Sequence, residues 1–174
     1  VAFLMADDSV GAPLYLYIGE KEGVGDGSFL DNNGLAKGKI YFWKADDGTV
    51  DPSGFKGTGT SKQGTFVELS ARDESNAGID GHDGLGYKDV VTLQNEAETS
   101  GGFNFSRPED VATNPDNGSQ AVFASTGFGS LFADDDWGTT YLLDANFSNY
   151  ADGNVTATLT ILYDGDDADK QDYG

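Results

Sequence analysis

The chain has 174 residues and a formal net charge of −20, from 10 basic and 30 acidic side chains. A surface this acidic excludes a nucleic acid or an anionic membrane held by a basic patch. Of the acids 23 are Asp, and 25 residues are Gly, which argues against a helical bundle because both residue types favour turns. The absence of cysteine excludes disulfides, zinc-thiolate sites and thiol nucleophiles. No apolar run is long enough to predict membrane insertion.

Eight short apolar stretches, rich in aromatic and β-branched residues and bounded by Gly, Asp and Asn, are typical of strands. In chain order they are 1–6, 13–19, 39–44, 65–69, 110–113, 120–125, 140–145 and 155–163. Turn sequences between neighbours, such as Asp46-Asp47-Gly48, predict antiparallel hairpins. A short helix at about 87–99, with its apolar residues on one face, divides the strands into two groups of four.

The predicted fold is all-β, with two four-stranded antiparallel sheets that resemble consecutive β-propeller blades. The expected organisation is a single partial domain over 1–174: a first sheet at 1–70 with a long insertion at 20–38, a loop plus helix at 71–102, a second sheet at 103–163 and an acidic tail at 164–174. Because two blades cannot close a ring, we expect either a fragment of a larger propeller or two sheets packed as a sandwich. Open blade faces would also permit self-association.

Arg107 is one of only two arginines, and Pro108 separates it from Glu109 at the entry of a predicted strand. Proline fixes φ and suits the first residue of a strand, so this segment displays a guanidinium and a carboxylate beside a loop. A functional interpretation is that Arg107 binds an oxyanion and Glu109 binds a hard cation. The alternative is a surface ion pair that stiffens the strand entry.

Two Asp-rich segments supply the carboxylate oxygens that calcium prefers. The candidates are Asp164 and Asp166 in one segment and Asp134 and Asp136 in the other. The alternative interpretation is that these segments are solvated acidic loops. Neither a nucleophile elbow of the Gly-x-Ser-x-Gly type nor a Gly-x4-Gly-Lys-Ser/Thr phosphate loop occurs, which argues against serine hydrolases of that class and P-loop enzymes.

The order of several segments resembles the PhoX-type alkaline phosphatases over about residues 1–163. The segments are Asp7-Asp8 after a strand, Leu14-Tyr15-Leu16-Tyr17, Gly34 to Phe42, Gly64 to Leu69, the short helix, and Arg107-Pro108-Glu109 before a strand and turn. This resemblance implies a bacterial, metal-dependent phosphomonoesterase built on a β-propeller, located outside the cell or in the periplasm. It also implies that the chain is a fragment, inactive alone, whose partners are a phosphate ester and the remainder of the propeller.

Residue by residue, the resemblance implies that Arg107 contacts the substrate phosphate and that Glu109 is a metal ligand. The implied metals are calcium and, in the complete protein, iron, whose ligands are not in this chain. Cations also fit the charge, because a chain at −20 repels a phosphate ester unless metal ions invert the local field.

Two further functions stay open at this point. One is a non-catalytic extracellular β module that binds calcium and, through its acidic loops, a carbohydrate or a protein. The other is a sugar or lactone hydrolase on the same architecture, since fold does not determine function.

Overall fold

The computed structural model describes residues 1–21 and 26–167. The strands are β1 (Ala2–Met5), β2 (Val10–Ala12), β3 (Tyr15–Gly19), β4 (Gly38–Ala45), β5 (Ser61–Leu69), β6 (Phe105–Ser106), β7 (Pro108–Thr113), β8 (Gln120–Ser125), β9 (Thr139–Asn149) and β10 (Asn154–Asp164). All eight predicted strands are present, although β5 and β9 are several residues longer than predicted. The strands β2 and β6 were not predicted, because two or three residues are too few to show an alternating apolar pattern.

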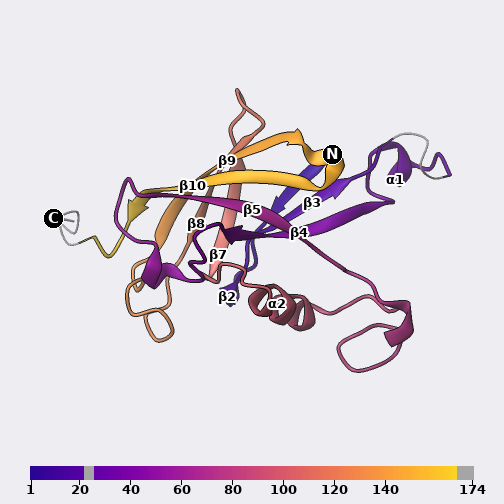
Figure 1. Cartoon of the computed structure of the whole chain (residues 1–174), viewed down its shortest axis with the longest axis horizontal. Helices are drawn as coiled ribbons and strands as arrows, with labels where there is room; N and C mark the ends of the chain where they lie inside the picture. The colour runs from indigo at the N-terminus through magenta and orange to yellow at the C-terminus, as the bar shows by residue number, and fades with distance from the viewer. Residues whose placement is uncertain (22–25, 168–174) are drawn as a thin grey trace.

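Eight strands form one antiparallel sheet in the order β1-β3-β4-β5-β10-β9-β8-β7, and Figure 1 shows it curling around a common interior. The prediction of two separate four-stranded sheets is therefore wrong. The two groups of four exist, but β5 of the first pairs with β10 of the second from Val155↔Phe66 to Thr160↔Ser61. This seam gives both strands partners for backbone groups that would otherwise form exposed sheet edges.

The sheet is nearly closed, with β1 and β7 as its two edges. At one end, the pair β2–β6 joins the chain just after β1 to the chain just before β7, through Val10↔Ser106 and Ala12↔Phe105. We call this the closed end. It also contains Pro108, Ser125, Thr139 and Asp164, which are consecutive partners across β7, β8, β9 and β10.

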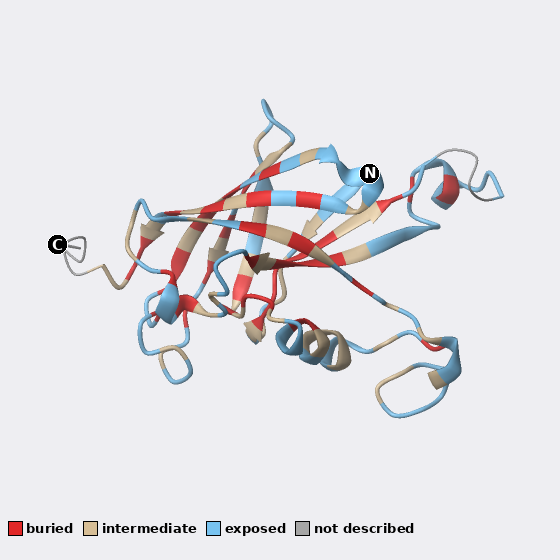
Figure 2. Cartoon of the chain, viewed as in Figure 1, coloured by how far each residue is buried: buried red, intermediate tan, exposed pale blue. Residues whose placement is uncertain are grey.

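The interior is a continuous apolar core to which both halves of the sheet contribute. Its fully buried rings include Trp43 from β4, Phe105 from β6 and Tyr141 from β9. Figure 2 shows the buried residues alternating with exposed ones along the long strands, as expected for a sheet with one face inward. Close packing explains Gly64, where an added Cβ would collide with the Trp43 ring.

The predicted helix at 87–99 is α2 (Val90–Thr99). It begins later than predicted because Asp89 is its N-cap, with the carboxylate accepting from the Thr92 N–H at 2.8 Å, while Tyr87 bridges to Arg72. Its buried Ala97 packs with Phe42 on the outer face of the sheet. In Figure 1 the helix accordingly lies to one side of β4.

The remaining helical segments are single turns in the connections. They are α1 (Phe29–Asn32) and three 3₁₀ turns, Pro52–Gly54, Glu74–Asn76 and Tyr150–Asp152. The helix α1 was not predicted and occupies part of the predicted insertion at 20–38. Residues 22–25 of that insertion lie outside the described residues. Of the predicted acidic tail, residues 168–174 also lie outside them, and Asp164 belongs to β10 rather than to a tail. No helix in the described ranges has the length and hydropathy needed to cross a bilayer.

Candidate functional site

Arg107 lies at the closed end, where it connects the two edges of the sheet. Its Nε and Nη2 donate to the carboxylate of Asp8 at 2.9 and 3.1 Å, a bidentate pair between residues 99 positions apart. Asp8 follows β1 and Arg107 precedes β7, so the pair spans the gap between these edge strands. Glu109 Oε1 lies 3.8 Å from Nη2. The structure therefore brings together two predicted site residues, Arg107 and Glu109, with Asp8.

The backbone around this triplet is strained. Arg107 has φ of 67°, and Asp110 has φ of 20°, both unusual for residues other than glycine. A register shift between Glu109 and Val111 marks a bulge in β7. Pro108 itself has a fixed φ and no N–H, so the positive φ values fall on its neighbours Arg107 and Asp110. Such strain persists where surrounding contacts over-determine it, and it is commonly found at functional sites.

The contacts that hold this strain come from β8 and the loop after it. The Arg107 carbonyl accepts from the Thr126 N–H at 3.0 Å, and the Ser106 carbonyl accepts from the Gly127 N–H at 2.9 Å. Ser106 is fully buried, and its carbonyl also accepts from Ser125 Oγ at 2.7 Å. The backbone at Arg107 is therefore held by a buried network, although its side chain is 36% exposed.

The guanidinium keeps unused donors. Of its five N–H groups, Asp8 takes one on Nε and one on Nη2. Within the described part of the chain, Nη1 makes no hydrogen bond and the Glu109 contact is too long to be one. Arg107 can therefore bind an oxyanion without first breaking its pair with Asp8. The local charge of Arg107, Asp8 and Glu109 is nevertheless negative, so an anion at this point needs additional positive charge.

Asp7, the residue beside Asp8, is anchored to the helix. Its Oδ2 accepts from Gln94 Nε2 of α2 at 2.9 Å. The neighbouring Tyr15 is buried, and its pKa is raised by burial and by the negative charge of Asp7. Asp7 and Asp8 thus connect α2 to Arg107 through the loop after β1.

The predicted acidic metal ligands differ in burial: Asp134 is half-exposed, whereas Asp164 is buried. Asp134 is half-exposed and pairs with Lys56 at 3.0 Å, and the carboxylate of Asp136 lies against the backbone at Gly129. Asp164 is buried, with Oδ2 accepting from the Gly57 N–H at 2.6 Å and Oδ1 from the Asp166 N–H at 2.9 Å. Asp166 in turn accepts from the Trp137 N–H at 3.0 Å.

Sequence reasoning missed Asp135, the most buried acid of the Asp134-Asp135-Asp136 run. It is 1% exposed, its Oδ1 accepts from Thr139 Oγ1 at 3.1 Å, and its Oδ2 has no partner among the described residues. Burial raises the pKa of Asp135 to about 7; the Thr139 hydrogen bond opposes this shift, and the negative charges of Asp166 and Asp164 add to it. In the sequence, the only signal is its place between two other acids.

No group of three or more acidic or histidine side chains among the described residues is arranged to hold a metal ion. Glu109 therefore belongs to no such group, and the acidic side chain that faces the same guanidinium, Asp8, is engaged by Arg107.

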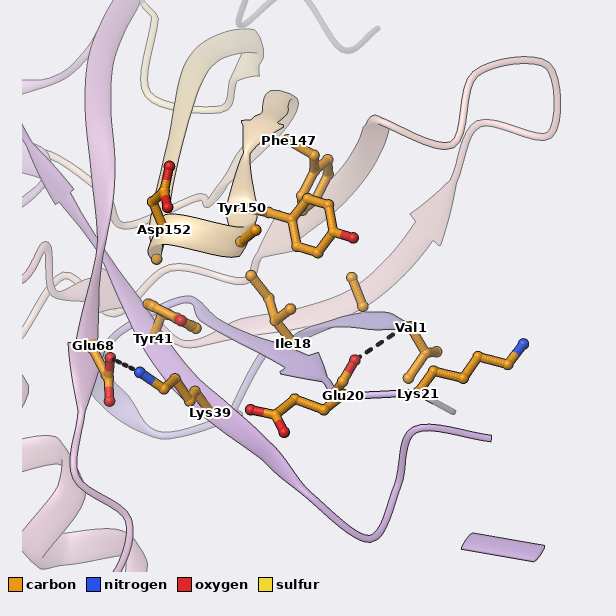
Figure 3. A pocket seen from close by; sticks show the side chains of 14 residues that line it. Val1, Ile18, Glu20, Lys21, Lys39, Tyr41, Glu68, Phe147, Tyr150 and Asp152 are labelled. Atoms are coloured by element: carbon orange, nitrogen blue, oxygen red, sulfur yellow. Dashed lines mark hydrogen bonds and ion pairs between the residues drawn. The ribbon is translucent and has the colours of Figure 1, made fainter. Parts of the chain in front are cut away.

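A separate hollow of about 890 Å³ lies at the opposite end of the sheet from Arg107. In Figure 3 the side chains of Ile18, Tyr41 and Phe147 point toward it, and the ion pair of Lys39 with Glu68, at 2.7 Å, lies on its rim. None of the predicted site residues lines this hollow. The predicted site residues therefore lie away from this hollow. Arg107 and Asp164 lie at the closed end of the sheet.

No model of a protein family matches the sequence, and no curated protein matches it. Among solved structures, the chain is similar to Pseudomonas fluorescens PhoX in complex with vanadate, a transition state analogue, with a TM-score of 0.59 and 17% identity. The similarity covers 91% of this chain and 28% of the PhoX chain, so the chain spans little more than a quarter of that protein's length. At this identity the likeness shows a shared fold.

Proposed function

We propose that the chain is the phosphate-contacting part of a PhoX-like, metal-dependent phosphomonoesterase located outside the cell or in the periplasm. The observation that carries the proposal is Arg107: a strained, buttressed residue at the closed end that keeps unused N–H donors beside Glu109. The fold shared with PhoX supports the same interpretation. The chain by itself contributes an oxyanion contact and not a complete active site.

Arg107 would bind a phosphate through the N–H groups of Nη1, because Nη2 contacts Asp8 and faces Glu109. A guanidinium suits this role because it is planar, always charged and able to donate two parallel hydrogen bonds to a tetrahedral oxyanion. Asp8 fixes the plane of the guanidinium from the opposite side. The binding geometry is therefore set before the phosphate arrives, which lowers the entropic cost of binding.

The proposal includes calcium, and iron in a longer protein, only as metals toward which Glu109 could contribute one ligand. Glu109 offers a hard oxygen donor, but the described residues around it do not form a cation site on their own. We therefore assign no reaction step to a metal on this chain. The proposal limits the chain's own chemistry to holding the phosphate and orienting its oxygens.

The two arginines of the chain make a direct test of this role, because the Nε–H region of a ¹⁵N NMR spectrum holds one signal for each of them. Arg72, which pairs with Glu74 at 2.9 Å and stacks over Tyr87, is the matched control. We expect inorganic phosphate or vanadate to shift the Arg107 signal with saturation and to leave the Arg72 signal in place. Arg107→Ala should weaken the binding about 10- to 100-fold, since it removes charge-assisted hydrogen bonds.

Equal shifts of both arginine signals, or no saturable shift of the Arg107 signal, would overturn the proposal. Stabilisation of the chain by calcium without any phosphate binding would instead favour a non-catalytic calcium-binding β module.

A further inference from the structure

The two edges of the eight-stranded sheet, β1 and β7, differ in how they are protected. β7 begins with Pro108, carries Glu109 and Asp110, and is bulged between Glu109 and Val111. A proline, charged side chains and a bulge are features with which proteins keep an edge strand from pairing with another chain. β1 has none of them, because the residues of Ala2–Met5 are all apolar and run in unbroken register with β3. The unprotected edge of the sheet is therefore β1.

The backbone of β1 has hydrogen-bonding groups that face away from the sheet. The Val1 carbonyl accepts from the Gly19 N–H at 2.8 Å, which makes these two residues a hydrogen-bonded pair. In an antiparallel ladder such pairs alternate with pairs that exchange no hydrogen bonds, so Phe3 also bonds to β3. The N–H and C=O groups of Ala2 and Leu4 point the other way, toward the side of β1 that has no neighbouring strand in the described structure. An added strand would use these groups.

A narrow cavity of about 60 Å³ lies on the inner face of the sheet beside this open edge. Ala2 and Leu4 line it from β1, and Thr113 and Ala121 line it from the β7–β8 hairpin, so it lies between the two edges. The other apolar residues that line it are Leu16, Phe66, Leu143, Ala145 and Phe147. Pockets for small molecules measure about 300–1,000 Å³, so this cavity suits a single aliphatic side chain instead.

The open backbone groups and the cavity together fit an extended peptide. Directly opposed residues of antiparallel strands present their side chains on the same face of the sheet. A residue that exchanges hydrogen bonds with Leu4 would therefore direct its side chain inward, toward the cavity that Leu4 itself lines. Its two neighbours in the peptide would lie on the outer face beside Phe3 and Met5, which are 44% and 36% exposed. The site thus favours a peptide with an aliphatic residue at the inward position.

Charge adds a second requirement on the peptide. Residues 2–5 and 108–125, which include both edges and the hairpin beside the cavity, contain Glu109, Asp110 and Asp116 but no lysine or arginine. A basic segment is attracted to such a surface. A second copy of the chain would instead bring another formal charge of −20 to this edge, which disfavours an edge-to-edge dimer. Electrostatics therefore favour a peptide that carries lysine or arginine.

We propose that β1 binds an extended segment of another protein by strand addition, with the segment antiparallel to β1, an aliphatic side chain in the cavity and basic residues at its ends. Hydrogen bonds to the backbone of Ala2 and Leu4 supply affinity, and the cavity supplies specificity, as is general for peptides that add to a sheet edge. The site uses neither Arg107 nor Glu109, so it does not depend on the proposed phosphate contact.

The probe is a fluorescently labelled peptide in which valines alternate with threonines between lysines at both ends, titrated into the whole chain and followed by anisotropy. We expect saturable binding. N-methylation of the valines should abolish it, because the N–H groups of the inward residues donate to β1. N-methylation of the threonines is the matched control and should preserve binding, because their N–H groups face away from β1. A peptide with glutamates in place of the lysines should bind more weakly.

Two variants of the chain test the same geometry. Ala2→Pro removes an N–H that faces the open edge and should weaken binding about 3- to 10-fold, the effect of one lost hydrogen bond. Ala121→Leu fills the cavity and should weaken binding about 10-fold or more, because the aliphatic side chain of the peptide is no longer buried. Ala112→Leu makes the same change at an exposed position of β7 and should leave binding unchanged.

Hydrogen exchange of the unmodified chain covers the case in which a variant folds poorly. Bound peptide should slow exchange of the Leu4 N–H several-fold and change the Phe3 N–H less, because the latter already bonds to β3. Three results would overturn the proposal: no saturable binding, equal binding of the two N-methylated peptides, or no slowing at Leu4. A concentration-dependent dimer in sedimentation, with the Leu4 N–H protected in the absence of peptide, would also overturn it, because a second copy would then occupy β1.

Discussion

The two halves of the eight-stranded sheet have the same number of strands but differ in regularity. In the half formed by β1, β3, β4 and β5, every pair runs in unbroken register. In the half formed by β7 to β10, register shifts occur once between β7 and β8 and twice between β9 and β10. Among the described residues, the non-glycine residues with positive φ, Arg107 and Asp110, both belong to this second half.

The difference indicates which half serves mainly as scaffold. Regular register allows the first half to supply apolar side chains evenly to the core, whereas each interruption in the second half redirects a side chain. The shift in β7 lies at Glu109, and one of the shifts in β9–β10 lies next to Asp164. Of the three shifts, the one in β7 therefore lies at a residue for which we propose a binding role.

The largest expected effect tests whether the two halves behave as one unit. Phe105 contacts rings from both halves, including Trp43 at a centroid distance of 6.4 Å and Phe123 at 5.3 Å. Phe105→Ala should lower the free energy of unfolding by about 3–5 kcal/mol, because it removes a fully buried ring. Phe29→Ala, at a position 75% exposed, should change it by less than about 0.5 kcal/mol.

Urea unfolding followed by circular dichroism and by tryptophan fluorescence measures both variants. The two probes should give coincident curves, since Trp43 lies in the first half and Trp137 in the second. Two separate transitions would show that the halves fold independently despite the seam.

The pH dependence of stability should have opposite signs at one acidic residue in each half, Asp135 in the second half and Asp47 in the first. In the second half, the raised pKa of Asp135, about 7, makes its contribution to stability greatest below its unfolded pKa near 4 and lost as the pH rises through 7. In the first half, the hydrogen bond from Lys62 lowers the pKa of Asp47 to about 2, so its contribution is present above pH 4 and lost as the pH falls through 2.

Urea unfolding in chelator-containing buffers from pH 2 to 8 measures both responses. Asp135→Asn should gain stability relative to the unmodified chain at pH 8 but not at pH 4. Asp47→Asn should be slightly less stable at pH 7 and equal at pH 2, a small effect because Asp47 is exposed. Responses of the same sign at both positions would contradict the assignment.

A smaller effect tests the strain at Arg107. Arg107→Gly should be more stable than Arg107→Ala by about 1 kcal/mol, because alanine retains the cost of the left-handed conformation and glycine does not. At Lys39, an exposed residue of a regular strand in the first half, the order should reverse. Chemical denaturation of the four variants gives the comparison, and the same order at both sites would argue against strain at Arg107.

The smallest expected effect concerns Asp8. Because its pair with Arg107 is exposed, Asp8→Asn should lower the free energy of unfolding by only about 0.2–1 kcal/mol. Phosphate binding should become several-fold tighter, since a negative charge beside the site is removed. The NMR titration described above measures it, and weaker binding would mean that Asp8 is needed to orient Arg107.

The sequence was sufficient for features that depend on neighbouring residues. The strands follow from apolar runs between turn residues, and α2 follows from its one-sided apolar pattern, although its start was placed too early because the Asp89 cap was not recognised. The seam could not be predicted, because the pairing of Ser61 with Thr160 depends on how the whole sheet curls. The two-sheet interpretation failed for that reason.

The candidate site, too, could be predicted only where its residues are neighbours in the sequence. Arg107 and Glu109 stand out because a proline lies between two charges at a strand entry. Their partner Asp8 is remote in sequence and is recognisable only once β1 and β7 are known to be the two edges. Asp135 could not be distinguished from Asp134 and Asp136, because burial decides its role and three adjacent acids have the same local pattern.

The seam between β5 and β10 also bears on how the chain acquires its structure. Its paired residues are 89 to 99 positions apart, whereas hairpins such as β3–β4 and β9–β10 join strands adjacent in the chain. Contacts between such distant segments form late and slow folding, because a long loop must be ordered first. During synthesis, β5 therefore has an unpaired edge until β10 leaves the ribosome. In that interval β5, which has no proline in Ser61–Leu69, presents an edge that can pair with another chain.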